Sequence, residues 1–255
     1  MRRLVRTITV GAALAGNTVR EALAGRAGLA VAAVAGLILV GAAALGALTL
    51  DDPGLAVRHV GLAGIDAGGI AAGLVLGVGL TARELEGGGA AIALTRPVTR
   101  RQLIVGRWLG IEIVCTLAVA ALSLVVLLSL ATRRAPIDLA LASYIWLDLV
   151  QALVVASVAV LAATLARPVP AGAFAIALTV IGRGLPELRT LAHQAGGVSG
   201  RAVEIVSLVL PNLYLYAPAN SPSGPYVFAA TTYGIGYAAL AVLLAAGAVR
   251  RRDFD

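Results

Sequence analysis

"LIVGRWLGIEIVCTLAVAALSLVVLLSL", residues 103–130, is an apolar run of 28 residues that contains only two charged side chains. A helix needs roughly 20 mostly apolar residues to cross the hydrocarbon core of a bilayer, which is about 30 Å thick. The run is therefore long enough to span a membrane, and it decides the class of fold.

The composition of the whole chain agrees with this interpretation. Hydrophobic residues make up 60% of the 255 residues and charged residues only 13%, whereas a soluble domain is about half apolar and a quarter charged. The net charge of +7 comes from arginines that lie between apolar runs. A nucleic-acid-binding protein gathers its charge on one soluble face, so we expect no nucleic-acid partner.

Several chemistries are excluded by residue type. All 20 basic residues are arginine, so the chain can hold neither a Walker A lysine nor a Schiff-base lysine. One cysteine and two histidines cannot by themselves form a thiolate or imidazole metal cage or a disulfide framework. We therefore expect no catalytic residue, no metal site and no cofactor within this chain.

Four further apolar runs are also long enough to span a membrane. With the run 103–130 they predict an all-α integral membrane protein with one domain, residues 1–255. A sixth run, 169–182, has about 14 apolar residues, roughly 21 Å of helix, and would be kinked, tilted or partly inserted. The six predicted spans are 28–50, 60–80, 103–130, 139–165, 169–182 and 226–249.

Arginine placement predicts the topology. With a cytoplasmic N-terminus, 14 arginines fall in inside segments and 6 in outside segments, so the positive-inside rule places both termini in the cytoplasm of a multi-pass inner (plasma) membrane protein. Residues 1–27 are predicted to form an interfacial helix whose arginines meet lipid headgroups. A signal peptide is the alternative, although its apolar part would be short.

The predicted outside segment, 183–225, is too long for a simple turn. Within it Arg201, Glu204 and Ser207 recur every three residues and form a polar stripe on an otherwise apolar helix. This pattern favours a short re-entrant or interfacial helix that dips into the outer leaflet or packs on the bundle, and that ends at Pro211.

Three carboxylates, Asp66, Glu112 and Asp148, fall inside predicted spans, where an ionised group costs several kcal/mol unless it meets a partner or water. Asp148 and Gln151 share one helix face with Tyr144, and this face is expected to point into the bundle or a cavity. These groups could relay protons or ions, or they could form hydrogen bonds between helices.

Small residues recur on the second predicted span. Gly69, Gly73 and Gly77 are spaced four residues apart, a pattern that allows another helix to approach closely. Tight packing within one chain and a dimer interface both remain open.

The polar stretch "RELEGGGAAIALTRPVTRRQ", residues 83–102, lies in the predicted cytoplasmic loop 81–102. Its apolar part, "AAIAL", is too short to cross a membrane and is bounded by glycines and Pro97, which predicts a short surface helix. Thr99 and Gln102 have the spacing of a capping box, so the third span is expected to start at Thr99. An ordinary basic loop that binds phospholipid phosphates is the alternative.

This stretch resembles the signature loop of type 2 ATP-binding-cassette (ABC) permeases. Thr99 stands where the family has serine, Arg107 where it has lysine, and Gly89 where it has threonine. "NTVREALAGR", "LPNLYLY" and "RRDF" are similar to other segments of the family, and the short six-span branch often labelled for multicopper-enzyme maturation looks closest. The residues that match the loop motif are Glu84, Glu86, Gly88, Pro97, Val98, Arg100 and Gly106.

The resemblance implies an ABC transporter permease, in most members an exporter. Such a subunit forms a homodimer or pairs with a sibling permease, contacts membrane lipids, and is powered by separate ABC ATP-binding subunits that bind the ATP. The alternatives are an ion- or proton-coupled secondary transporter that uses Asp66, Glu112 or Asp148, and a non-transporting membrane assembly factor. The implied coupling residues are Glu84, Glu86, Gly88, Arg96, Pro97, Thr99 and Arg100.

Overall fold

The structure is a computed structural model that describes residues 2–25, 53–86 and 99–250, together with the isolated positions 33, 36, 37, 40, 41 and 44. Within these residues the chain is helical and has no strand, which confirms the predicted all-α class. The helices are α1 (Arg2–Ala24), α3 (Pro53–Glu86), α5 (Arg100–Thr132), α6 (Leu139–Leu165), α7 (Pro168–Arg183), α8 (Leu185–Ala195), α9 (Gly197–Val209), the 3₁₀ turn η1 (Leu213–Tyr216) and α10 (Gly224–Arg250).

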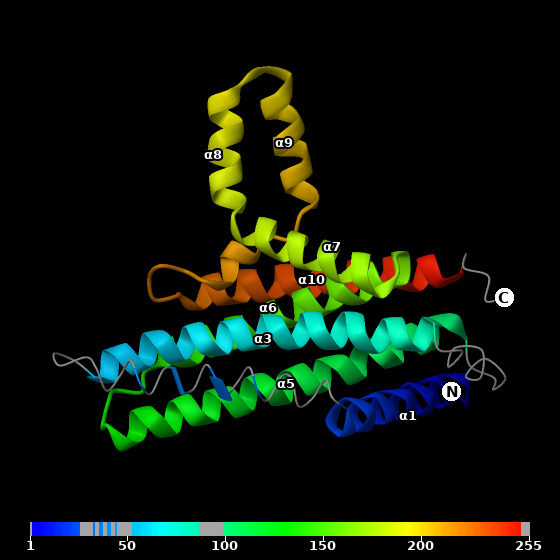
Figure 1. Cartoon of the computed structure of the whole chain (residues 1–255), viewed down its shortest axis with the longest axis horizontal. Helices are drawn as coiled ribbons and strands as arrows, with labels where there is room; N and C mark the ends of the chain where they lie inside the picture. Colours follow the sequence, from blue (N-terminus) through cyan, green and yellow to red (C-terminus); the bar gives the residue numbers. More distant parts are fainter. Residues whose placement is uncertain are drawn as a thin grey trace.

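The long helices form a bundle with a roughly common axis (Figure 1). The centre of the bundle is α6, which contacts α3, α5, α7 and α10. The amphipathic α1 packs against α5. The start of α1, the end of α3, the start of α5 and the end of α10 all lie at the same end of the bundle (Figure 1).

Four of the described helices are long and apolar enough to cross a membrane. They contain the predicted spans 60–80, 103–130, 139–165 and 226–249. The predicted span 28–50 lies outside the described residues except for the isolated positions. The 16-residue α7 contains the predicted span 169–182 and bends by 69° into α8, so the two together count as one broken span at most.

The outer faces of these helices are apolar. Leu117 and Leu128 on α5 and Phe228 and Leu243 on α10 are each more than half exposed. Large apolar side chains in such numbers are not kept in water by a soluble monomer. They are the surface that a helix presents to lipid tails.

The glycine stripe of α3 packs against α6 within the same chain. A Cβ atom at Gly73 would lie 3.0 Å from the backbone nitrogen of Ala156, and one at Gly77 would lie 2.6 Å from Cβ of Ala159. The two helices therefore meet through main-chain atoms, which only residues without side chains allow.

A helical hairpin, α8 and α9, projects sideways from the bundle (Figure 1). The turn between its helices is made by Gly196 and Gly197, with φ angles of 59° and 61°, a conformation that favours glycine. The predicted helix before Pro211 is present as α9 and ends at Val209. It pairs with α8, a helix that the sequence analysis did not predict.

Candidate functional site

The predicted coupling loop is bounded by the end of α3 and the start of α5. Thr99 caps α5: its Oγ1 accepts from the backbone nitrogen of Gln102 at 3.3 Å, and Oε1 of Gln102 accepts from the backbone nitrogen of Thr99 at 3.0 Å. The predicted capping box and the start of the helix at Thr99 are thus confirmed. Residues 87–98, with Gly88, Arg96 and Pro97, lie outside the described residues, as do the side chains of Glu86 and Arg100.

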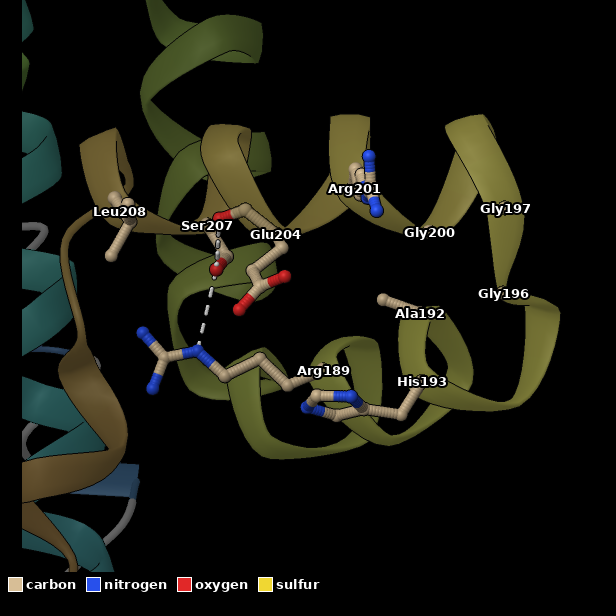
Figure 2. A pocket seen from close by; sticks show the side chains of 10 residues that line it. All are labelled: Arg189, Ala192, His193, Gly196, Gly197, Gly200, Arg201, Glu204, Ser207 and Leu208. Atoms are coloured by element: carbon tan, nitrogen blue, oxygen red, sulfur yellow. Dashed lines mark hydrogen bonds between the residues drawn. The ribbon is translucent and has the colours of Figure 1, made fainter.

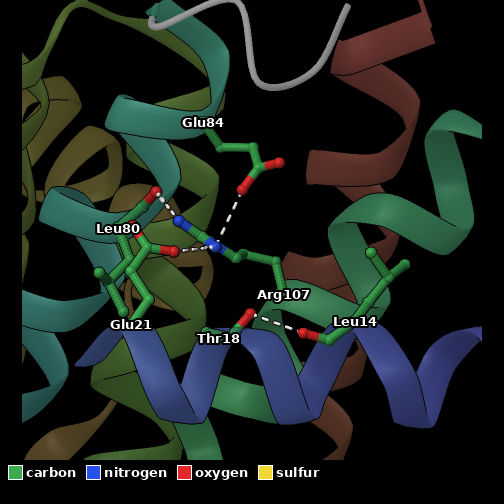
Figure 3. Close-up of polar contacts among 6 residues, drawn as sticks. All are labelled: Leu14, Thr18, Glu21, Leu80, Glu84 and Arg107. Carbon is green, nitrogen blue, oxygen red and sulfur yellow. Dashed lines mark hydrogen bonds and ion pairs between the residues drawn. The ribbon is translucent and has the colours of Figure 1, made fainter. Parts of the chain in front are cut away.

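Arg107 lies two turns into α5 and binds groups on two other helices (Figure 3). Its Nη1 atom is 2.7 Å from Oε2 of Glu21 on α1 and 2.9 Å from Oε2 of Glu84 on α3. Its Nη2 atom donates to the backbone oxygen of Leu80 on α3 at 2.7 Å. We call this group, Arg107 with Glu21, Glu84 and the Leu80 carbonyl, the Arg107 junction.

The junction is largely buried. Arg107 is only 4% exposed, and the side chains of Glu84 and Glu21 are 20% and 36% exposed. A buried guanidinium is tolerated only when anions and hydrogen-bond acceptors surround it, and removing such a partner typically costs about 3–5 kcal/mol. The junction therefore holds α1, α3 and α5 together at the end of the bundle where the predicted coupling loop begins and ends.

Close packing supports the contact between α1 and α5. A Cβ atom at Gly110 would clash with Thr18 of α1, so glycine at this position lets the two helices touch. The predicted interfacial role of residues 1–27 stays a prediction.

The structure gives Glu84 a partner that the sequence analysis did not name. The resemblance implied that Glu84 contacts an ATP-binding subunit, whereas its carboxylate binds Arg107 in the same chain. Glu21 was not singled out at all. The usable signal was Arg107 itself, because an arginine inside an apolar run needs a buried partner.

A second polar cluster joins α3, α6 and α7. Nε2 of Gln151 donates to Oδ1 of Asp66 at 2.5 Å, and Arg183 forms an ion pair with the same carboxylate. Gln151 is fully buried, and its Oε1 lies 3.4 Å from Nη2 of Arg183. The predicted polar face of α6 does point into the bundle, where it meets Asp66.

The other predicted carboxylates differ in their surroundings. Asp148 lies one turn before Gln151 and is 6% exposed. Glu112, on α5, has no contact with this cluster among the described residues, and its buried Oε1 atom has no hydrogen-bond partner there. The structure thus brings Asp66, Asp148 and Gln151 together and leaves Glu112 apart.

An open pocket of about 520 Å³ lies between the two helices of the α8–α9 hairpin. Arg189 of α8 and the stripe residues Arg201, Glu204 and Ser207 of α9 line it (Figure 2). Nε of Arg189 donates to Oγ of Ser207 at 3.3 Å. The polar stripe therefore faces α8, while apolar residues such as Ile205 and Val209 remain exposed.

Comparison with known proteins identifies a family. Residues 65–253 match the model of a family described as "ABC-2 family transporter protein". The matched range covers most of α3 and all of α5 to α9 and η1, and it reaches the end of α10. No curated protein matches the chain.

Proposed function

Because the chain belongs to the ABC-2 family of transporter proteins, we propose that it is the membrane subunit of an exporter that is driven through the Arg107 junction. Family membership makes it a multi-pass membrane subunit of an ABC transporter and implies association with ATP-binding subunits. Export, the contact with those subunits through loop 81–102, and pairing with a second permease are our proposal. The match favours this function over a secondary transporter or an assembly factor.

The absence of lysine from the chain supports a separate source of energy. A Walker A site requires a lysine that reaches the β- and γ-phosphates of ATP, and all 20 basic residues here are arginine. ATP would therefore be bound by a partner subunit. The role of this chain would be mechanical and electrostatic, without bond chemistry of its own.

The Arg107 junction is the observation that carries the proposal. It lies at the two helix ends that border residues 87–98, and it ties both helices to α1 through contacts of 2.7–2.9 Å. A push on the loop would then move α1, α3 and α5 together. Without the junction, the loop could shift one helix end and leave the other in place.

From α3 the movement would continue to α6. The glycine contacts at Gly73 and Gly77 leave no side-chain layer between these helices, so little displacement is lost in side-chain rearrangement. Since α6 contacts α5, α7 and α10 as well, it would distribute the movement through the bundle.

The predicted coupling residues divide into two roles in this proposal. Glu84 acts through Arg107 and fixes the end of α3, and Thr99 fixes the start of α5 by capping it. The remaining residues would contact the ATP-binding subunit: Glu86, Gly88, Arg96, Pro97 and Arg100.

Two experiments test the proposal in sequence. The tagged full-length chain should co-purify with an ATP-binding subunit, and Glu86→Arg combined with Arg100→Glu should abolish this. If no ATP-binding subunit co-purifies with the unaltered chain, the proposed function is wrong.

The second experiment addresses the junction. Arg107→Met should leave the ATP-binding subunit attached but remove the ATP-dependent change in the distance between spin labels on α3 and α10. Arg58→Met is the matched control. Arg58 also forms an ion pair between helices, because it binds Asp138, the N-cap of α6, but it lies near the start of α3, away from the Arg107 junction. An unchanged ATP response in Arg107→Met would rule out coupling through the junction.

A further inference from the structure

An open cavity of about 570 Å³ lies where α3 and α6 begin, at the end of the bundle away from the Arg107 junction. Residues in the first half of α3, the first turns of α6 and the segment 216–221 line it. Its volume falls within the range of small-molecule sites, about 300–1,000 Å³. The cavity is therefore large enough for an organic ligand.

Asp148 is the unusual group in this cavity. Its side chain lines the cavity, and the residue is 6% exposed. Among the described residues it has no hydrogen-bond donor and no cationic nitrogen within 4.0 Å. A buried carboxylate without a donor is costly, so a ligand that supplies a donor or a positive charge would stabilise it.

The neighbouring charges do not neutralise Asp148. Arg183 pairs with Asp66, which also accepts from Gln151. Arg58 and His59 also line the cavity, but the guanidinium of Arg58 is engaged by Asp138 through two hydrogen bonds of 3.0 Å. When both are ionised, Asp66 and Asp148 have only the guanidinium of Arg183 between them, so one of the two carboxylates has no counter-ion of its own.

The walls favour an organic cation over a metal ion. The ring of Tyr144 lines the cavity with Leu62 and Pro218. Aromatic rings attract alkylammonium groups through their π faces, and the apolar walls suit alkyl substituents. A divalent metal such as Ca²⁺ or Mg²⁺ would instead require a shell of about six or more oxygen ligands.

We propose that this cavity binds an amphipathic organic cation, an alkylated ammonium, with Asp148 as its counter-ion. The ammonium lies beside the Asp148 carboxylate, and its substituents contact Tyr144, Leu62 and Pro218. The proposal goes beyond the proposed function and does not depend on it, because binding requires no ATP-binding subunit. The two ideas can fail separately.

Isothermal titration calorimetry with benzyltrimethylammonium tests the proposal on the purified full-length chain in dodecyl maltoside. The unaltered chain should bind this cation, and Asp148→Asn should bind it at least about tenfold more weakly, because a buried charge pair loses one partner. Glu112→Gln, which changes a carboxylate elsewhere in the bundle, should bind as the unaltered chain does. Equal binding by Asp148→Asn, or no binding by the unaltered chain, would overturn the proposal.

A second measurement needs no variant and decides the case if Asp148→Asn fails to fold. An apolar carbodiimide is allowed to react with the unaltered chain, and mass spectrometry then locates the modified carboxyl groups. Benzyltrimethylammonium should slow modification of Asp148 severalfold and leave that of Glu112 unchanged. Equal rates of Asp148 modification with and without the cation would contradict the proposal.

Discussion

Glu21 and Arg107 lie 86 residues apart in the sequence and form an ion pair of 2.7 Å. This pair attaches α1 to the bundle, so Glu21→Ala should loosen α1. Hydrogen exchange of residues 14–24 should become faster, whereas exchange in α6 should not change. The effect should be about 1–2 kcal/mol, below that of a fully buried pair, because Glu84 and the Leu80 carbonyl still bind Arg107.

A matched variant separates the two carboxylates of the junction. Glu84→Ala should accelerate exchange at the end of α3 in the same experiment. If Glu21→Ala left α1 as protected as before, the contact at Gly110 alone would account for the attachment of α1.

The main-chain contact between α3 and α6 predicts a difference between two glycines on the same helix. In Gly77→Ala the new methyl group would lie 2.6 Å from Cβ of Ala159 and 3.0 Å from the carbonyl oxygen of Ala156. The helices must then separate, which should lower the free energy of unfolding by about 1–3 kcal/mol. Thermal unfolding of the purified chain in detergent measures this loss.

Gly79→Ala is the control for that experiment. Among the described residues, no atom beyond the adjoining turns of α3 lies within 4 Å of a Cβ atom at Gly79, and alanine favours a helix over glycine by about 1 kcal/mol. This variant should be as stable as the unaltered chain or more stable. Equal losses in both variants would mean that α3 and α6 do not meet at Gly77.

The cap of α5 can be tested with a conservative pair of substitutions. Thr99→Ala removes the hydroxyl that accepts from the backbone nitrogen of Gln102, and it should cost about 1 kcal/mol of stability. Thr99→Ser retains the hydroxyl and should be close to neutral. Chemical unfolding in detergent would measure both, and an equal loss in the two variants would contradict a role for the cap.

Acid should weaken the contact between α3 and the N-terminus of α6. The hydrogen bonds from Arg58, followed by that from the backbone nitrogen of Leu141, lower the pKa of Asp138 below its ordinary value. A carboxyl group whose pKa is lower in the folded state contributes stability above its unfolded pKa of about 3.9, and this contribution is lost as the pH falls through the folded pKa. Asp138→Asn should therefore remove part of the acid dependence of stability below about pH 4.

Asparagine caps a helix about as well as aspartate, so Asp138→Asn tests the ion pair with Arg58 rather than the cap. The loss at neutral pH should be at most about 1 kcal/mol, because the side chain of Asp138 is 47% exposed. Unfolding curves of both proteins between about pH 3 and pH 7 would measure it. Parallel curves over that range would contradict the prediction.

Local patterns in the sequence predicted much of the bundle. The apolar runs predicted the long helices, and Thr99 with Gln102 predicted the start of α5. Both signals depend on residues that are close together in the chain, and a helix forms from such local spacing. The small-residue spacing on α3 also indicated a close contact, but not that α6 would fill it.

The polar contacts were harder to predict because they join distant parts of the chain. Arg183 was interpreted as an outside arginine, and nothing in its local sequence points to Asp66, 117 residues away. Glu21 likewise has no local signal for Arg107. The α8 helix was missed because "LPELRTLAHQA" is too polar for a span and too short for a clear helical pattern.

The glycine contacts of α3 restrict how the bundle can move. Ala156 and Ala159 lie so close to Gly73 and Gly77 that α3 cannot turn about its own axis without driving a bulkier neighbour such as Leu74 or Leu76 into the backbone of α6. Rotation of one helix against the other is thereby blocked, and only joint tilting of the pair as one rigid body remains. Any opening of this bundle is therefore expected at the other faces of α6, against α5, α7 and α10.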